Sequence, residues 1–145
     1  MYRHILIATD GSELAGKAVA AGLALAKQLD AKVTAVTVIE PWPSIAKHIA
    51  ISHAAAFMEY QKAAKHDAAR ILGEVNRTAQ NLGVQCETVT ATGSAAEAII
   101  ETANGKPCDL IVMSSHGRRG LVRVLLGSQA MRVLTLSSLP VLICR

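Results

Sequence analysis

The sequence predicts one α/β domain over residues 1–145, built on a parallel β-sheet with helices on both faces. Strand-like and helix-like segments alternate five times along the chain, which is typical of parallel strands joined by helical crossovers. Several strand-like segments are uninterrupted apolar runs, as expected for strands covered on both sides. Hydrophobic residues make up 51% of the chain and charged residues 18%, which favours one folded core over a disordered chain.

The first predicted elements are a strand, a helix and a strand. Residues 3–9 are a β-rich apolar run, and residues 32–39 are a continuous β-branched run. Residues 12–30 between them are predicted to be helical, with Glu13 in the first turn, where a carboxylate suits the helix dipole. The apolar face of this helix consists of Ala15, Val19, Gly22, Ala26 and Leu29.

A loop, a long helix and a third strand are predicted next. Pro41-Trp42-Pro43 breaks the strand pattern, and a helix follows over residues 54–82 with Gly83 as its C-terminal stop. The inner stripe of this helix consists of Ala68, Ile71, Leu72, Val75, Ala79 and Leu82. Residues 84–91 are strand-like, and the polar alternation in their first half favours the edge of the sheet.

The last third of the chain repeats the alternation. Gly93-Ser94 begins a short helix that Asn104-Gly105 closes. Residues 109–113 are predicted to form a buried strand, residues 128–136 a helix, and residues 140–144 the last strand.

A glycine-bearing loop between the strand at 109–113 and the helix at 128 is the strongest functional signal. It begins with Ser114-Ser115-His116-Gly117 and ends with Gly127-Ser128. Glycines let the backbone approach an anion, and the unpaired N–H groups and dipole of a helix N-terminus favour negative charge. We therefore predict a phosphate site in this loop.

Asp10 is predicted to face the same loop. Ligands of parallel sheets bind outside the carboxyl ends of the strands, where the strand order reverses. The first and fourth strands end at Thr9-Asp10 and Met113-Ser114, so Asp10 would face the glycines if these strands are neighbours. Its carboxylate could then bind a ribose hydroxyl or a metal ion that bridges phosphates, or it could cap the first helix or its turn.

A second glycine pattern, Gly11 to Ala18, matches most of a P-loop but lacks its final hydroxyl residue. Glu13, Leu14 and Ala15 are helix formers where a P-loop needs an open loop. We therefore expect a helix there and no phosphate site.

The chain resembles the universal stress protein family over essentially all of its length. The matching segments are Ile5-Leu-Ile-Ala-Thr-Asp-Gly-Ser12, Val36-Thr-Val-Ile-Glu40, Gly93-Ser94, Asp109-Leu-Ile-Val-Met-Ser-Ser-His-Gly117, Leu125-Leu-Gly-Ser128 and Pro140-Val-Leu-Ile-Cys144. The nucleotide-binding branch of the family carries G-2x-G-9x-G-[ST]. Gly117, Gly127 and Ser128 match its last three positions, and Ser114 replaces its first glycine.

The resemblance implies a Rossmann-like open sheet with strand order 3-2-1-4-5. It also implies a regulatory role in a stress response, and ATP, or AMP or another adenine nucleotide, as the ligand, with Mg²⁺ on the phosphates. By position, Ala8, Thr9 and Asp10 would border the adenosine, and Val38 would meet adenine through its backbone. The ribose and phosphates would be lined by Met113, Ser114, His116 and Gly117, and the outer phosphates by Gly127, Ser128, Gln129 and Ala130.

Two residues depart from the family pattern. The Cβ and hydroxyl of Ser114 could crowd the approach of ribose or phosphate, and the Gln129 amide could either reach a phosphate or block one. We expect weaker or altered binding from them, and a dimeric scaffold that binds no nucleotide is the alternative.

The resemblance also implies a homodimer paired through the last strand, Val141–Cys144. The apolar run at 141–143 supports this, because an exposed apolar edge invites pairing with another chain. The alternative is that the C-terminus packs under a helix.

No catalytic residue is predicted. His116 could contact a phosphate or move a proton, but no partner base or nucleophile can be named beside it, so the chain is expected not to be an enzyme, with slow ATP hydrolysis left open. The other histidines, His4, His48, His53 and His66, lack metal-ligand spacing and are expected at the surface or half-buried. Asp10 is the one residue predicted as a possible protein ligand for a Mg²⁺ ion bound with ATP.

The remaining features exclude several partner classes. The net charge of +4 comes from scattered basic residues, and four aromatic residues are few for stacking bases, so no nucleic-acid binding is expected. No apolar run reaches the ~18 residues of a membrane span, and no signal-peptide pattern opens the chain, which predicts a cytoplasmic protein. Cys86, Cys108 and Cys144 are expected to be buried, inert thiols.

Four arginines gather around the glycine loop: Arg118, Arg119, Arg123 and Arg132. They could attract a polyphosphate, or they could form a solvated helix face. The second interpretation is preferred for Arg123 and Arg132, and both stay open for the other two.

Overall fold

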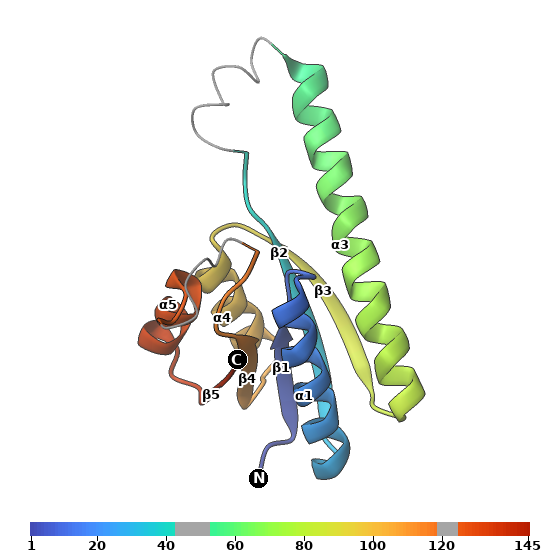
Figure 1. Cartoon of the computed structure of the whole chain (residues 1–145), viewed down its shortest axis with the longest axis vertical. Coiled ribbons are helices and arrows are strands. Elements are labelled where there is room, and N and C mark those ends of the chain that lie inside the picture. Colours follow the sequence, from blue (N-terminus) through green and yellow to red (C-terminus); the bar gives the residue numbers. More distant parts are fainter. Residues whose placement is uncertain (43–52, 119–124) are drawn as a thin grey trace.

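The computed structural model describes residues 1–42, 53–118 and 125–145, and its five strands form one parallel sheet. The sheet order is β3-β2-β1-β4-β5, as predicted (Figure 1). The strands are β1 His4–Ala8, β2 Lys32–Ile39, β3 Cys86–Thr92, β4 Leu110–Ser114 and β5 Val141–Cys144. Because the order reverses between β1 and β4, the carboxyl ends of these two strands define the place where a ligand can bind.

In the described part of the chain, four helices cover the two faces of the sheet. They are α1 Glu13–Leu29, α3 Ala54–Leu82, α4 Ala95–Gly105 and α5 Ser128–Leu136. Ile5 and Ile7 of β1 pack with α1 and α3 in one apolar cluster, whereas Leu6 and Ala8 pack with α4 and α5 in another. All four of these β1 side chains are buried. The sheet therefore has two apolar faces, which explains why its central strands are continuous apolar runs.

The predicted helix patterns are confirmed. The α1 face predicted from the sequence is buried except for the half-buried Leu29, and the α3 stripe is buried except for the half-buried Leu82. Ser12 caps α1 by accepting a hydrogen bond from the Ala15 N–H, and Gly83 ends α3 with a φ of 72°. The third strand does lie at the sheet edge. Its observed start at Cys86 is two residues later than predicted, and Pro43 of the predicted loop lies outside the described residues.

The segment with the P-loop pattern is helical, as expected. Residues from Glu13 onward belong to α1, and the Gly16 N–H donates to the Ser12 carbonyl at 2.9 Å. Lys17 lies exposed on this helix. The segment therefore has no open loop that could cradle phosphates.

His4 lies in the core, so the prediction of a surface or half-buried position was wrong for this histidine. It is 4% exposed, and its Nε2 lies 2.8 Å from the Thr34 hydroxyl oxygen. The same hydroxyl donates a hydrogen bond to the Glu87 carboxylate at 2.8 Å, so its one hydrogen is used there. It can therefore only accept a hydrogen bond from His4, which means that Nε2 of the imidazole carries the hydrogen. Nδ1 is buried and has no hydrogen-bond partner among the described residues. Burial, with the nearby Lys32 charge, lowers the pKa of His4, while Glu87 and Asp109 oppose the shift.

We expect the free energy of unfolding to decrease as the pH falls from 7 to 5.5. The folded-state pKa of His4 lies below the ordinary histidine value of 6.5, so the unfolded chain takes up this proton first, and the stability present above pH 6.5 is lost as the pH falls. Urea unfolding at the two pH values measures the change. His4→Gln retains an N–H donor for Thr34 and does not titrate, so its stability should decrease less. An equal decrease in both proteins would contradict the role of His4.

The cysteines are free thiols with raised pKa values. Cys108 is buried, and burial raises its pKa to about 11. Cys86 and Cys144 are half-buried rather than buried, and burial raises the pKa of each. A raised pKa disfavours the reactive thiolate, which agrees with the expectation of inert thiols.

Candidate functional site

A cleft of about 840 Å³ opens at the carboxyl ends of the central strands. Its size is within the range of small-molecule sites. The walls come from the ends of β1, β2 and β4, from the loop after β4, and from α3, α4 and α5. All twelve residues named above as candidates for nucleotide contact line this cleft. The predicted positions, spread over the chain from residue 8 to residue 130, are therefore brought together in space.

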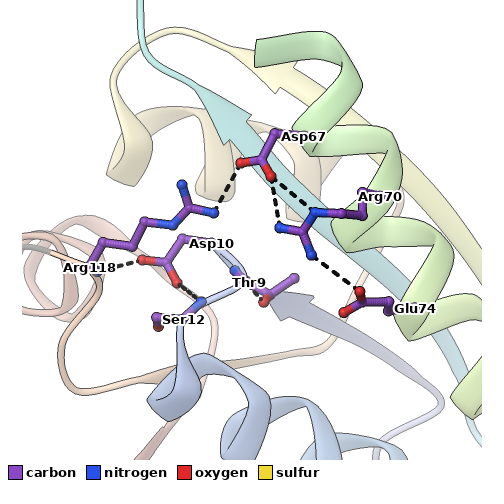
Figure 2. A network of polar contacts seen from close by, with 8 residues as sticks. Thr9, Asp10, Ser12, Asp67, Arg70, Glu74 and Arg118 are labelled. Atoms are coloured by element: carbon purple, nitrogen blue, oxygen red, sulfur yellow. Dashed lines mark hydrogen bonds and ion pairs between the residues drawn. The ribbon is translucent and has the colours of Figure 1, made fainter. Parts of the chain in front are cut away.

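Asp10 connects the end of β1 to the loop after β4. Its Oδ1 accepts a hydrogen bond from the Ser12 N–H at 2.9 Å, and its Oδ2 accepts one from the Arg118 N–H at 2.8 Å (Figure 2). The prediction that β1 and β4 are neighbours is confirmed by their pairing. Ser12, and not Asp10, is the N-cap of α1, while Asp10 closes the turn before it.

The two motif glycines lie where a side chain would make close contacts within the chain itself. A Cβ at Gly117 would lie 2.5 Å from Oδ2 of Asp10, and a Cβ at Gly127 would lie 2.8 Å from the Ser115 carbonyl oxygen. The Gly127 N–H also donates to that carbonyl at 2.8 Å, so it is not available to a phosphate. These contacts hold the beginning of α5 against the end of β4.

Three residues at the N-terminus of α5 line the cleft, and their backbone N–H groups have no partner among the described residues. The first hydrogen bond inside this helix runs from the Met131 N–H to the Gly127 carbonyl, so the N–H groups of Ser128, Gln129 and Ala130 have no carbonyl partner within the helix. Gly127, the N-cap, provides no side-chain acceptor. Three adjacent donors at the positive end of a helix dipole are an arrangement that binds anions.

Gln129 also holds the beginning of α4. Its Oε1 accepts a hydrogen bond from the Ala96 N–H at 3.1 Å, and Ala95 lies in the cleft wall. The amide therefore caps a neighbouring helix, which ties the N-termini of α4 and α5 together. This contact was not foreseen from the sequence.

Ser114 and His116 are held by contacts within their own loop. The Ser114 hydroxyl donates to the His116 carbonyl at 2.8 Å, and Nδ1 of His116 lies 3.2 Å from the Ser115 hydroxyl oxygen. Ser114 is 8% exposed. The hydroxyl that could crowd a ligand is thus turned to the loop backbone.

The α3 wall of the cleft was missed by the sequence analysis. Its residues are Tyr60, Ala63, Ala64, Asp67, Ala68 and Ile71. Asp67 forms ion pairs with Arg118 at 3.0 Å and with Arg70 at 2.7 Å, and the hydrogen bonds from these arginines lower the pKa of its carboxyl (Figure 2). The signal was available, because Tyr60, Ala64, Asp67 and Ile71 continue the inner stripe of α3 toward its N-terminus at helical spacing.

The other predicted charged residues have different positions. Arg132 pairs with Glu97 of α4, which supports the solvated-face interpretation for this arginine. His53 and His66 are exposed, as expected. Arg119, Arg123 and His48 lie outside the described residues. Within residues 1–42, 53–118 and 125–145, no three His, Cys, Asp or Glu side chains gather as a metal site.

None of the helices in the described parts of the chain is long and apolar enough to cross a membrane.

The chain is similar to proteins of one family in sequence and in structure. A model of the universal stress protein family matches residues 1–145. The universal stress protein YxiE of Bacillus subtilis is 34% identical over 148 aligned residues, which cover both chains completely. The solved structure of protein MJ0577, from Methanocaldococcus jannaschii, has a TM-score of 0.83 and 26% identity, over 99% of this chain and 96% of that one. A universal stress protein solved in complex with cAMP has a TM-score of 0.69 and 26% identity, over 99% and 97%. Since the family model spans the whole sequence, the chain belongs to the universal stress protein family.

Proposed function

We propose that the protein is a regulatory nucleotide-binding protein that holds ATP with Mg²⁺ in the cleft and acts in a cytoplasmic stress response. The observation that carries this proposal is the N-terminus of α5, where the N–H groups of three residues that line a nucleotide-sized cleft have no partner in the described part of the chain. The similarity to a universal stress protein in complex with cAMP supports an adenine nucleotide as the class of ligand.

The residues present fit a nucleotide from end to end. Ala8, Thr9 and Met113 would border the nucleoside, and Val38 at the end of β2 would meet adenine through its backbone. The outer phosphates would bind the N–H groups of Ser128, Gln129 and Ala130 by charge-assisted hydrogen bonds. The Ser114 hydroxyl, bonded to the His116 carbonyl, would leave room for the ribose.

A divalent cation fits this cleft as part of the nucleotide complex. The carboxylates of Asp10, Glu40 and Asp67 line it together with the guanidinium of Arg118, so its lining carries net negative charge among the described residues. A bare polyphosphate would be repelled by this charge, whereas Mg²⁺ bound to the phosphates reduces the repulsion. Asp10 is the carboxylate that we propose for contact with the ion.

We propose binding without catalysis. His116 is the residue with acid-base chemistry in the loop. Its Nδ1 lies 3.2 Å from the Ser115 hydroxyl oxygen, which leaves Nε2 as the nitrogen that would have to act as a general base. Slow hydrolysis in the same cleft is the alternative. It would be recognised by phosphate release that is lost on changing His116 while ATP binding is retained.

We further propose that two chains pair through β5. This strand is at the sheet edge, and Leu142 on it is 40% exposed. Met131, Leu134 and Leu136 of the neighbouring α5 are also exposed, and apolar side chains left exposed near one another are typical of a contact surface with another chain. Sedimentation velocity should show a dimer, and a monomer at micromolar concentration would contradict this proposal.

Titration calorimetry with Mg-ATP, AMP and cyclic AMP tests the proposed ligand. Binding of at least Mg-ATP with one site per chain is the expected result. If no nucleotide binds at millimolar concentration, the proposal is contradicted, and the alternative is that the protein acts as a dimeric scaffold that binds no nucleotide.

A further inference from the structure

Two carboxylates hold Arg118 at the edge of the cleft, each by a different group. The backbone N–H of Arg118 donates to Oδ2 of Asp10 at 2.8 Å. Its guanidinium forms an ion pair with Oδ2 of Asp67 on α3 at 3.0 Å (Figure 2). The main chain of Arg118 is thus tied to β1, while its side chain is turned toward α3. The guanidinium could therefore leave Asp67 for another partner while the backbone of Arg118 stays bound to Asp10.

The Asp67–Arg118 ion pair is easily exchanged. The side chains of Arg118 and Asp67 are 51% and 38% exposed, and pairs with that much contact with water contribute little to stability. The second oxygen of Asp67, Oδ1, is bound to Arg70 at 2.7 Å, and Arg70 also pairs with Glu74 at 3.1 Å. If Arg118 leaves, Asp67 therefore keeps a cationic partner.

A phosphate chain in the cleft would be the stronger partner for Arg118. A guanidinium binds phosphate through two parallel hydrogen bonds, and a polyphosphate carries more charge than one carboxylate. The residue lies close to the phosphate end of the cleft. A Cβ atom added to Gly127 would lie 3.4 Å from the Cα of His116. Arg118 is two residues further along the chain, so its Cα lies at most about 7.6 Å from the Cα of His116.

We propose that Arg118 determines how many phosphates the cleft prefers, and that Asp67 competes with the ligand for its guanidinium. A monophosphate stays near Gly117 at the end of β4 and leaves Arg118 on Asp67. The outer phosphates of a triphosphate reach the α5 N–H groups and take Arg118 from Asp67, which adds affinity for ATP over AMP. This inference rests on the proposed nucleotide function and assigns a specificity-determining residue to the same site.

The exchange would also loosen α3. All buried residues of this helix lie at Ala68 or beyond, while its N-terminal part, which begins at residue 54, projects past the sheet (Figure 1). Asp67 is therefore at the boundary between the projecting part and the packed part. The Tyr60 hydroxyl, which donates to the Glu40 carbonyl at 3.0 Å, would remain as a contact of the projecting part.

The test compares the dissociation constants of Mg-ATP and AMP for the full-length protein and three variants. Asp67→Asn removes the competing charge, so ATP should bind about threefold more tightly, with little change for AMP. Arg118→Gln removes the guanidinium, so ATP should bind about tenfold more weakly, again with little change for AMP. Glu74→Gln is the matched control, because this carboxylate lies on the same helix and in the same network but pairs with Arg70 and does not line the cleft. It should change neither constant.

The outcomes separate this inference from the proposed function. If the unmodified protein binds ATP, but Asp67→Asn changes ATP and AMP affinity equally or acts no more strongly than Glu74→Gln, the inference is overturned and the nucleotide function stands. If the unmodified protein binds neither nucleotide, both are overturned. Thermal unfolding of each variant should match that of the unmodified protein, since the residues exchanged are partly exposed.

Discussion

Replacing Ser128 by aspartate is expected to abolish ATP binding while the protein stays folded. Ser128 is exposed at the first position of α5, and its N–H is one of the unpaired donors of that helix. A carboxylate there suits the helix dipole, so stability should stay the same or increase by about 0.3–1 kcal/mol. The same carboxylate would lie beside the bound phosphates, and like charges brought together at a binding site weaken affinity by about a hundredfold or more.

Calorimetry with Mg-ATP and thermal unfolding measure the two effects of Ser128→Asp. Ser128→Asn is the matched control, because it has the same size without the charge, and it should retain most of the affinity. The account is contradicted if the aspartate variant binds ATP as tightly as the asparagine variant. The opposite signs of the two effects separate a local repulsion from general damage to the fold.

Gly127→Ala is expected to reduce both stability and ATP affinity. The backbone of Gly127 has φ −62° and ψ 154°, which alanine adopts without strain, so the effect would come from the new methyl group alone. That methyl would lie 2.8 Å from the Ser115 carbonyl oxygen, and α5 would have to move away from β4. Overpacking of this kind costs about 1–3 kcal/mol of unfolding free energy.

Gly117→Ala provides the comparison for this prediction. Its methyl would meet the end of the Asp10 side chain, which can rotate at the expense of the hydrogen bond to Arg118. We expect a smaller loss of stability than for Gly127→Ala, measured by urea unfolding. Equal stability of Gly127→Ala and the unmodified protein would show that α5 does not depend on the contact with Ser115.

The sequence predicts the sheet and its helices well because hydrophobic periodicity reports burial directly. The bounds of β2, α3 and α5 agree with the prediction to the residue, and each is a segment with a strong pattern or a clear stop. Ser12 and Gly83, at the ends of α1 and α3, have the chemistry of helix caps. The glycine loop also predicted the end of the sheet at which the cleft opens, while phosphate binding there stays a prediction.

The sequence could not predict contacts between distant side chains. Asp67 and Arg118 are 51 residues apart, and Gln129 and Ala96 are 33 apart. No local pattern links either pair, so the α3 wall and the cap of α4 became visible only in the fold. His4 was misplaced for a related reason. A single polar residue in a strand does not reveal that a buried hydroxyl, Thr34, lies within reach on the neighbouring strand, two residues beyond its register partner Lys32.

The most direct test of phosphate binding at the beginning of α5 is a ¹⁵N–¹H spectrum recorded as Mg-ATP is added. We predict that the amide signals of Ser128, Gln129 and Ala130 shift strongly, because their N–H groups gain charged acceptors, while signals at the opposite end of the sheet, around Asp30 to Lys32, stay in place. Unchanged α5 signals at saturating Mg-ATP, or shifts confined to the first turn of α1, would contradict the account.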